Sequence, residues 1–267
     1  MVEATIEHFN AVALKKIAFL KQSIGRYFIF SMMAGAHIGF AITLIFAIGG
    51  PFKAANDPAL KALMGASFGI ALALVIFAGS ELFTGNNMTL MIASLSKKVT
   101  WRDTLWLWLV CYLGNLAGSL LLAYGVAASG IMKDSPGGAL VLTTAAAKMQ
   151  APWMELFVRG ILCNMLVCLA VWTAARTKDD TAKLLLIFWC LFAFIGSGFE
   201  HSIANMSLLG IGLFIPHDPT AVSWAGYARN LIPVTLGNVV GGAVFIGAAY
   251  WYVANLPKTT ANAKEII

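Results

Sequence analysis

Long apolar runs separated by short polar connections dominate this sequence. A helix needs about 20 apolar residues to cross the hydrocarbon core of a bilayer, and each run is at least that long. The sequence therefore predicts an all-α integral membrane protein with six transmembrane helices. The runs cover roughly residues 27–50, 62–95, 105–130, 153–175, 183–215 and 230–255.

The composition argues against the other fold classes. Hydrophobic residues make up 60% of the chain and charged residues only 11%, whereas soluble domains carry about 25% charged residues. Outer-membrane barrels show segments of about ten alternating residues, and no such alternation recurs here. The net charge of +6 could indicate a nucleic-acid partner, but Lys and Arg are spread over the connections instead of forming one stripe. We expect a lipid membrane and no nucleic acid.

The two ends of the chain are polar. Residues 1–26 are predicted to form a cytoplasmic N-terminal amphipathic helix, which lies on the membrane surface or docks in subunit assembly. Residues 256–267 are predicted to form a cytoplasmic C-terminal tail. Acids at Glu3 and Glu7 distinguish the N-terminus from a cleaved signal peptide. The apolar residues at helical spacing are Ile6, Phe9, Ala13, Ile17 and Leu20.

The distribution of basic residues predicts the orientation. Six spans place both termini on one side of the membrane. That side carries twelve of the Lys and Arg residues outside the spans, and the opposite side carries five. The positive-inside rule therefore places both termini in the cytoplasm.

Two runs are too long to be single spans. Met64–Ser94 would reach about 46 Å as one helix, against a hydrocarbon core of roughly 30 Å. Its middle holds polar residues such as Ser80, Glu81 and Asn86, and the middle of Leu184–Ile215 is similarly polar. We predict that segments 2 and 5 are broken at mid-membrane. Irregular backbone at that depth is tolerated where it lines a cavity or packs on protein, so the breaks indicate a site.

The two breaks belong to a tandem repeat. Residues 81–88 read ELFTGNNM and 200–206 read EHSIANM, with the two Asn-Met pairs aligned. LGNLAG at 113–118 recurs as LGNVVG at 236–241. The repeats cover about 27–130 and 153–255. Because each copy has three spans, the second enters the membrane from the opposite side, which predicts an inverted 3+3 repeat with a site between the halves.

The chemistry expected at the breaks favours an anion. Each break restarts a helix, and a helix N-terminus carries free N–H donors and about half a positive charge. Thr84 and Ser202 are expected to be the N-cap residues, while Asn87 and Asn205 are expected to satisfy the loosened backbone. Two such helix starts facing each other would attract an anion.

His201 is the main candidate for a functional residue. It lies in the second break and its charge can change near pH 6.5, so it could donate a hydrogen bond to an anion or pass a proton to it. The alternative is a histidine that ties the break together. Glu81 and Glu200 would repel an anion, so we expect them to accept hydrogen bonds from the broken backbone.

Other polar residues carry weaker signals. Lys148 is expected in the outer-side connection before segment four, where it recruits anions or is simply solvated. His37 and Arg159 are pore-facing or interfacial, with the interfacial position favoured. The four cysteines have no metal-ligand or disulfide spacing, so we expect core positions, no metal and no cofactor.

Three motifs resemble the formate/nitrite transporter family, with the nitrite channel branch the most similar. They read AGSELFTG at 78–85, LCNMLVCLAVW at 162–172 and GFEHSIANM at 198–206, and the resemblance covers all six spans. It implies an aquaporin-like fold, a homopentamer with one pore per protomer, and passage of small monovalent anions such as nitrite, formate or hydrosulfide. A bacterial inner-membrane location follows from the same resemblance.

The resemblance also implies roles for particular residues. Thr84, Lys148 and His201 would form the polar centre of the pore, and Asn164, Glu200 and Asn238 would support it. Apolar collars on either side would exclude water and hydrated cations. The constriction residues would be Leu72, Leu82, Phe83, Val167 and Phe194.

Three classes of function therefore remain. The leading hypothesis is a nitrite channel, passive or proton-coupled. The second is a channel for neutral solutes such as water, glycerol or ammonia, which broken helices in inverted repeats also serve. A membrane enzyme has little support because the sequence offers no metal cluster, no nucleophile with a nearby base and no sizeable soluble domain.

Overall fold

A computed structural model describes residues 2–255, and all regular structure in that range is helical. The predicted tail at 256–267 lies outside the described residues. Six stretches are long and apolar enough to cross a membrane, which confirms the predicted fold class. The elements are α1 (Val2–Gln22), α2 (Ile24–Ala54), α3 (Leu60–Ser67), α4 (Ile70–Ala73), the π-helix η1 (Leu74–Gly79), α5 (Phe83–Leu95), α6 (Trp101–Ala128), α7 (Pro136–Gln150), α8 (Trp153–Ala174), α9 (Asp180–Ser197), α10 (Ser202–Phe214), α11 (Trp224–Val239), the π-helix η2 (Val240–Ala248) and α12 (Ala249–Ala254).

The spans extend beyond the predicted apolar runs because capping residues set their ends. Ser23 begins α2, since its side chain accepts a hydrogen bond from the Arg26 N–H. Ser223 begins α11 in the same way by accepting from the Gly226 N–H. The predicted start of the sixth span at residue 230 was too late. Hydropathy falls at Arg229, but α11 already includes this residue.

The outer surface of the bundle is apolar. Large side chains stand well exposed on several spans, among them Leu121 (64%), Trp189 (62%) and Ile232 (58%). Soluble monomers rarely expose contiguous patches of this kind. Such a surface suits hydrocarbon or a neighbouring subunit.

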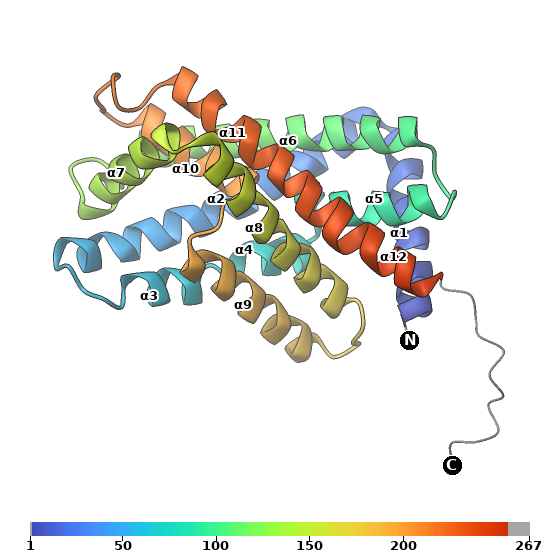
Figure 1. The fold of residues 1–267 in the computed structure, drawn as a ribbon. Helices are drawn as coiled ribbons and strands as arrows, with labels where there is room; N and C mark the ends of the chain where they lie inside the picture. Colours follow the sequence, from blue (N-terminus) through green and yellow to red (C-terminus); the bar gives the residue numbers. More distant parts are fainter. Residues whose placement is uncertain (1, 256–267) are drawn as a thin grey trace, which may run out of the picture.

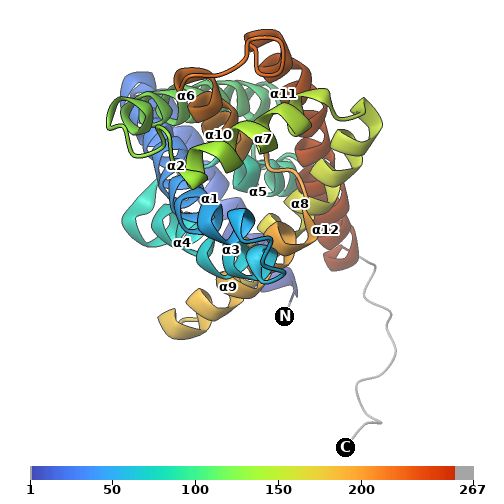
Figure 2. The same cartoon turned by 90° about the vertical axis from the view of Figure 1, so that its left-hand side faces the viewer.

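The short helices α5 and α10 lie in the middle of the molecule. Figure 2, viewed along the bundle, shows them surrounded by the longer helices α2, α6, α8, α9 and α11. Almost every residue of α10 is buried, and so are ten of the thirteen residues of α5. The first residues of these two helices are therefore inside the protein.

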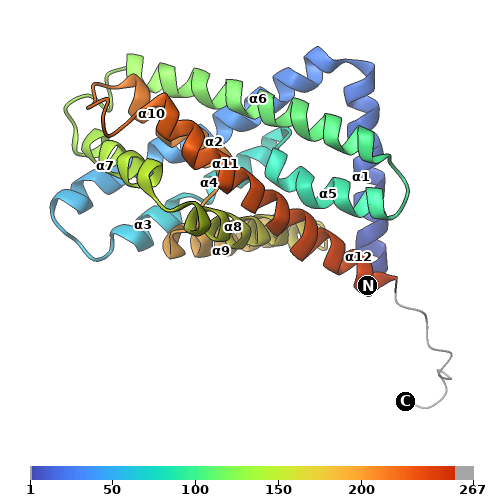
Figure 3. The ribbon, with the colours of Figure 1, turned by 45° about the horizontal axis from the view of Figure 1, so that its top comes forward.

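Helix α1 runs across the ends of the other helices (Figures 1 and 3). Its five predicted apolar residues are all buried, because α1 packs along α5 and α12. The end of α12 and the start of α1 lie at the same end of the bundle. The large polar face that remains on α1 includes Lys16, which reaches the first break.

Helix α7 was not predicted. It fills the connection between the third and fourth spans, in which we expected Lys148 but no helix. Ser135 caps it by accepting from the Gly138 N–H, and Pro136 occupies its first position. Ser-Pro followed by an alanine-rich stretch is a helix-start signal that a search for membrane spans passes over.

Close helix packing depends on a few glycines. A Cβ on Gly118 of α6 would lie 1.9 Å from the Met32 carbonyl oxygen of α2. A Cβ on Gly241 of η2 would lie 2.2 Å from the Ile161 carbonyl oxygen of α8. These contacts bring the backbones together as small residues do in membrane helix pairs.

Candidate functional site

Both long segments are broken, as predicted. The first break follows η1, with Gly79 at φ 82°, and the chain restarts as α5 at Phe83. The second follows α9, with Gly198 at φ 75°, and the chain restarts as α10 at Ser202. Glycine tolerates this left-handed conformation without a Cβ clash, so it ends each preceding helix sharply.

Two asparagines outside the breaks hold the restarted helices. Asn115 Oδ1 accepts from the Phe83 N–H at 2.9 Å, and its amide donates to the Ser31 and Glu81 carbonyls. Asn238 Oδ1 accepts from the Ser202 N–H at 2.8 Å, and its amide donates to the Gly160 and Glu200 carbonyls. Both asparagines are fully buried.

These bonds correct the prediction for the loosened backbone. Asn115 and Asn238 satisfy the helix starts, and the predicted Asn87 and Asn205 bind side chains instead. The signal was present, because Asn115 and Asn238 are the asparagines of the repeated LGNLAG and LGNVVG motifs. Sequence reasoning used those motifs for the repeat and missed the role of Asn115.

The starts of the two short helices meet at Thr84 and His201. Thr84 Oγ1 lies 3.1 Å from His201 Nε2, and both side chains are buried, with exposures of 0% and 4%. The structure thus brings together two residues that are 117 positions apart. This contact joins the first turn of α5 to the N-cap of α10.

The predicted N-cap residues were wrong. The N-cap of α5 is Leu82, whose side chain makes no capping bond, and Thr84 lies inside the helix. The N-cap of α10 is His201, while the hydroxyl of Ser202 is buried without a hydrogen-bond partner. Each helix begins earlier than the polar residue suggested, because an asparagine from another helix takes the first N–H.

The capping bond of His201 fixes its ring chemistry. The Ala204 N–H donates to Nδ1 at 3.1 Å, so Nδ1 must carry a lone pair. In the neutral ring the proton is then on Nε2, which faces Thr84. The ring also stacks on Phe194, with centroids 5.9 Å apart and planes at 16°. His201 therefore presents an Nε2–H donor of fixed direction.

The glutamates next to the breaks form buried ion pairs. Glu200 Oε1 accepts from Lys148 Nζ at 2.6 Å, and its other oxygen accepts from the Asn205 amide. Glu81 Oε1 accepts from Lys16 Nζ at 2.6 Å, and its Oε2 accepts from the Asn86 amide. Lysine and asparagine side chains therefore hold these carboxylates, and not the backbone N–H groups of the breaks that were predicted to do so.

Lys148 lies in the connection before the fourth span, as predicted, but in the last turn of α7, and with a side chain only 19% exposed it is not an ordinary solvated lysine. His37 bonds Ser80 of the first break at 3.2 Å, and Arg159 pairs with Glu155 one turn earlier on α8 at an exposed position.

Cys111, Cys163 and Cys168 are buried, and Cys190 is half-buried.

Asn164 of α8 connects the two halves of the site. Its amide lies within hydrogen-bond distance of the Thr84 carbonyl, Asn87 Oδ1 and the Asn238 carbonyl. It is fully buried. Asn164 therefore ties α5 to α11 beside the Thr84–His201 contact.

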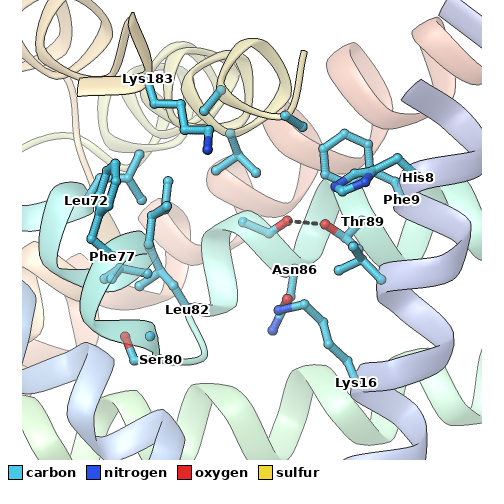
Figure 4. A pocket seen from close by; sticks show the side chains of 18 of the residues that line it. His8, Phe9, Lys16, Leu72, Phe77, Ser80, Leu82, Asn86, Thr89 and Lys183 are labelled. Carbon is cyan, nitrogen blue, oxygen red and sulfur yellow. Dashed lines mark hydrogen bonds between the residues drawn. The ribbon is translucent and has the colours of Figure 1, made fainter. Parts of the chain in front are cut away.

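Two cavities flank this contact. The larger, of about 830 Å³, has Leu72, Leu82 and Lys16 on its wall (Figure 4). The smaller, of about 150 Å³, has Phe194, Lys148 and His201 on its wall.

The cavities lie at opposite ends of α9, since Asp180 and Lys183 line the larger and Phe194 and Gly198 line the smaller. Of the predicted constriction residues, Phe83 and Val167 line neither cavity. Phe83 packs edge-on against Trp108 and Tyr112 of α6, and Val167 is buried in the core.

Within residues 2–255 no cluster of three His, Cys, Asp or Glu side chains has the arrangement needed to hold a metal ion. The polar groups at the centre are hydrogen-bond donors and amides. Such a set can bind an anion by replacing its hydration.

Known proteins resemble this chain along nearly its whole length. The family model for the formate/nitrite transporter matches residues 3–252. The nitrite transporter NirC of Escherichia coli (strain K12) is 46% identical over 239 residues, which cover 86% of this chain and 85% of that protein.

Two solved structures share the fold. One, described as an FNT family ion channel, is 42% identical with a TM-score of 0.87, and the match covers 94% of this chain and 98% of that one. The other, a pentameric formate channel with formate bound, is 33% identical with a TM-score of 0.76, and the match covers 87% and 98%. The family suggested by the sequence motifs is thus confirmed, and this chain belongs to the formate/nitrite transporter family.

Proposed function

We propose that this protein is a membrane channel for small monovalent anions, with nitrite as the first candidate and His201 at the centre of the path. The observation that carries the proposal is the Thr84–His201 contact, which joins the starts of two broken helices between two cavities. Both groups can donate a hydrogen bond toward a passing anion once their mutual contact opens.

The physical basis is the replacement of hydration. An anion that leaves water must find donors at the narrowest point. The starts of α5 and α10 carry partial positive charge, and His201 adds an Nε2–H while Thr84 adds a hydroxyl. Leu72, Leu82 and Phe194, which line the cavities, are the proposed collars that keep bulk water and hydrated cations out, while Phe83 and Val167, which line neither cavity, stay predicted constriction residues.

His201 serves this path best as a neutral donor. A second proton would have to be carried by Nδ1, which already accepts from the Ala204 N–H. Charging the ring would therefore break the cap of α10. Proton-coupled transport through His201 has to pass through that state, whereas passive conduction does not.

Formate is the second candidate, and hydrosulfide a third. NirC supports nitrite, and the formate-bound relative supports formate. All three are small anions with a single charge, so the same donors suit each. A channel for neutral solutes is the remaining alternative, because the charges beside the breaks cancel in pairs, Lys16 with Glu81 and Lys148 with Glu200.

The remaining features of the proposal follow from the family and from charge. We expect a homopentamer in a bacterial inner membrane, with one path per protomer and both termini in the cytoplasm. We expect no cofactor and no catalysis. The apolar surface of α2, α6 and α11 would then be divided between lipid and neighbouring subunits.

The test is nitrite flux into liposomes that contain the purified protein, with formate as competitor and empty liposomes as control. We expect nitrite to enter the protein-containing vesicles faster. Equal rates in both would overturn the proposal, formate flux that excludes nitrite would select the second candidate, and glycerol flux without anion flux would select the neutral-solute channel.

A further inference from the structure

The lysines nearest the site offer no net charge to an entering anion. Lys148 is paired with Glu200 and Lys16 with Glu81, each at 2.6 Å and each largely buried. A pair with one positive and one negative group has only a short-range field. Any attraction of anions at the cavity mouths would therefore have to come from another group.

Lys61 is placed for this role at the smaller cavity. It lies in the first turn of α3, is exposed, and lines the same cavity as His201. It makes no ion pair with any residue between 2 and 255, and the cavity wall includes no Asp or Glu. The acid nearest in sequence, Asp57, accepts from the Ala59 N–H in the preceding turn.

The larger cavity has an equivalent group. Lys183 on its wall pairs with Asp180, but Lys178 is exposed and makes no ion pair within the described range. The larger wall also holds the paired Lys16 and Lys183, and the smaller wall holds the paired Lys148. Each cavity thus has one exposed lysine on its wall that makes no ion pair within residues 2–255. The two ends of the path are alike in this respect.

We propose that Lys61 is an anion-capture residue, which raises the local concentration of the transported anion at the mouth of the smaller cavity and so sets the entry rate from that side. The inference rests on the proposed anion channel. The mechanism is long-range attraction, which salt screens over about 10 Å at 0.1 M and about 30 Å at 0.01 M. Lys61 therefore acts on entry at low anion concentration, and flux at saturation is unchanged.

The test is nitrite flux through the full-length protein in liposomes for Lys61→Glu and Lys61→Gln, with anion added on the side of the smaller cavity. Reversing one charge roughly 10 Å from the entering anion should reduce flux about threefold at 0.01 M salt, with Lys61→Gln in between. Near 1 M salt the variants and the wild type should agree.

Lys53→Glu is the matched control. Lys53 lies in the last turn of α2, is also exposed, and is not among the residues that line the cavity. The same charge reversal there should reduce flux at low salt by less than Lys61→Glu does, because Lys53 does not line the cavity. Lys178→Glu should reduce entry only from the side of the larger cavity.

Two failures can be told apart. If wild-type protein carries neither nitrite nor formate, the anion channel itself is wrong. If the wild type conducts but Lys61→Glu matches Lys53→Glu at low salt, or loses flux equally at all salt concentrations, Lys61 has no capture role and the channel proposal is untouched.

Discussion

At the scale of single residues, Asn115 and Asn238 are the side chains that hold the two restarted helices in place. Each makes three buried hydrogen bonds that hold one helix start. Asn238→Leu would remove the partner of the Ser202 N–H and of the Glu200 carbonyl, each at a cost of about 1–3 kcal/mol, while the Gly160 carbonyl keeps its bond within α8. We expect Asn238→Leu and Asn115→Leu to lower the thermal unfolding temperature in detergent by a similar, large amount.

The control for this comparison is Asn255→Ala. Asn255 is exposed, and its amide bonds the Trp251 carbonyl of its own helix. Its loss should change the free energy of unfolding by less than about 0.5 kcal/mol. If Asn238→Leu unfolded at the wild-type temperature, water or a backbone movement would have to replace the hydrogen bonds of Asn238.

His201 has two functions that substitutions can separate. Asparagine is a good N-cap residue, so His201→Asn should keep the cap of α10 while losing the Nε2–H donor. His201→Phe should lose both and keep the stacking on Phe194. A hydrogen bond to a charged group contributes about 1.5–3 kcal/mol, so we expect His201→Asn to reduce nitrite flux about 10- to 100-fold with little loss of stability.

His217→Asn provides the matched control, since His217 lies in the connection after α10 and its ring bonds the Ile215 carbonyl. Flux should be measured at about pH 5.5 and about pH 7.5, on either side of the ordinary titration range of histidine. If His201→Asn conducts at the wild-type rate, the histidine is only a cap. If it keeps full flux at one pH alone, the ring takes part in proton transfer.

Two of the predicted site residues lie close together, whereas most of the contacts around them were not predicted. His201 and Thr84 were expected at the centre, and the structure places them 3.1 Å apart. The caps were wrong because a hydroxyl one residue inside a helix is indistinguishable in sequence from one that caps it. The hydrogen bonds of the two helix starts and the ion pairs of the glutamates were missed. Their partners, such as Asn115 and Lys16, lie on other helices, and no local sequence pattern connects them to the breaks.

At the scale of helices, close packing through glycine makes a direct prediction. Gly118→Ala in α6 would place a methyl group 1.9 Å from the Met32 carbonyl oxygen, so α2 and α6 would have to separate. Gly125→Ala in the same helix meets nothing within 4 Å. We expect Gly118→Ala to lower the yield and unfolding temperature of the folded protein, and Gly125→Ala to leave both unchanged or slightly higher, since alanine favours helix.

If Gly118→Ala were as stable as the wild type, the approach of α2 to α6 would be adjustable, and the glycine would have no packing role. The six spans themselves could be read from the sequence because hydrocarbon thickness imposes a minimum length on each. Helix α7 was missed because its 15 residues are too short for a span, and its start signal at Ser135 and Pro136 is local and independent of hydropathy.

At the scale of the whole molecule, equivalent hydrogen bonds connect the two halves. Glu81 binds Asn86 and a lysine, and Glu200 binds Asn205 and a lysine. The offset from Glu81 to Glu200 and from Asn86 to Asn205 is the same, so Asn86, and not Asn87, corresponds to Asn205. This agreement supports the inverted repeat, which stays a prediction, and corrects its alignment by one residue.

The inverted repeat requires the two cavities to open on opposite sides of the membrane. They lie at the two ends of α9, whose 18 residues extend about 27 Å, close to the hydrocarbon thickness. Thr144 lines the smaller cavity and Thr177 the larger. In a background with the half-buried Cys190 changed to serine, a membrane-impermeant maleimide should label the Thr144→Cys variant in intact cells and leave the Thr177→Cys variant unlabelled.

Inverted membrane vesicles should give the reverse pattern, because the positive-inside rule predicts that the larger cavity and α1 lie on the cytoplasmic side. The background protein without either new cysteine is the control, since its other three cysteines are buried. Labelling of both variants from one side would mean that the cavities share a face of the membrane. The Thr84–His201 contact would then not lie between two compartments, and a path for anions through it would have to be abandoned.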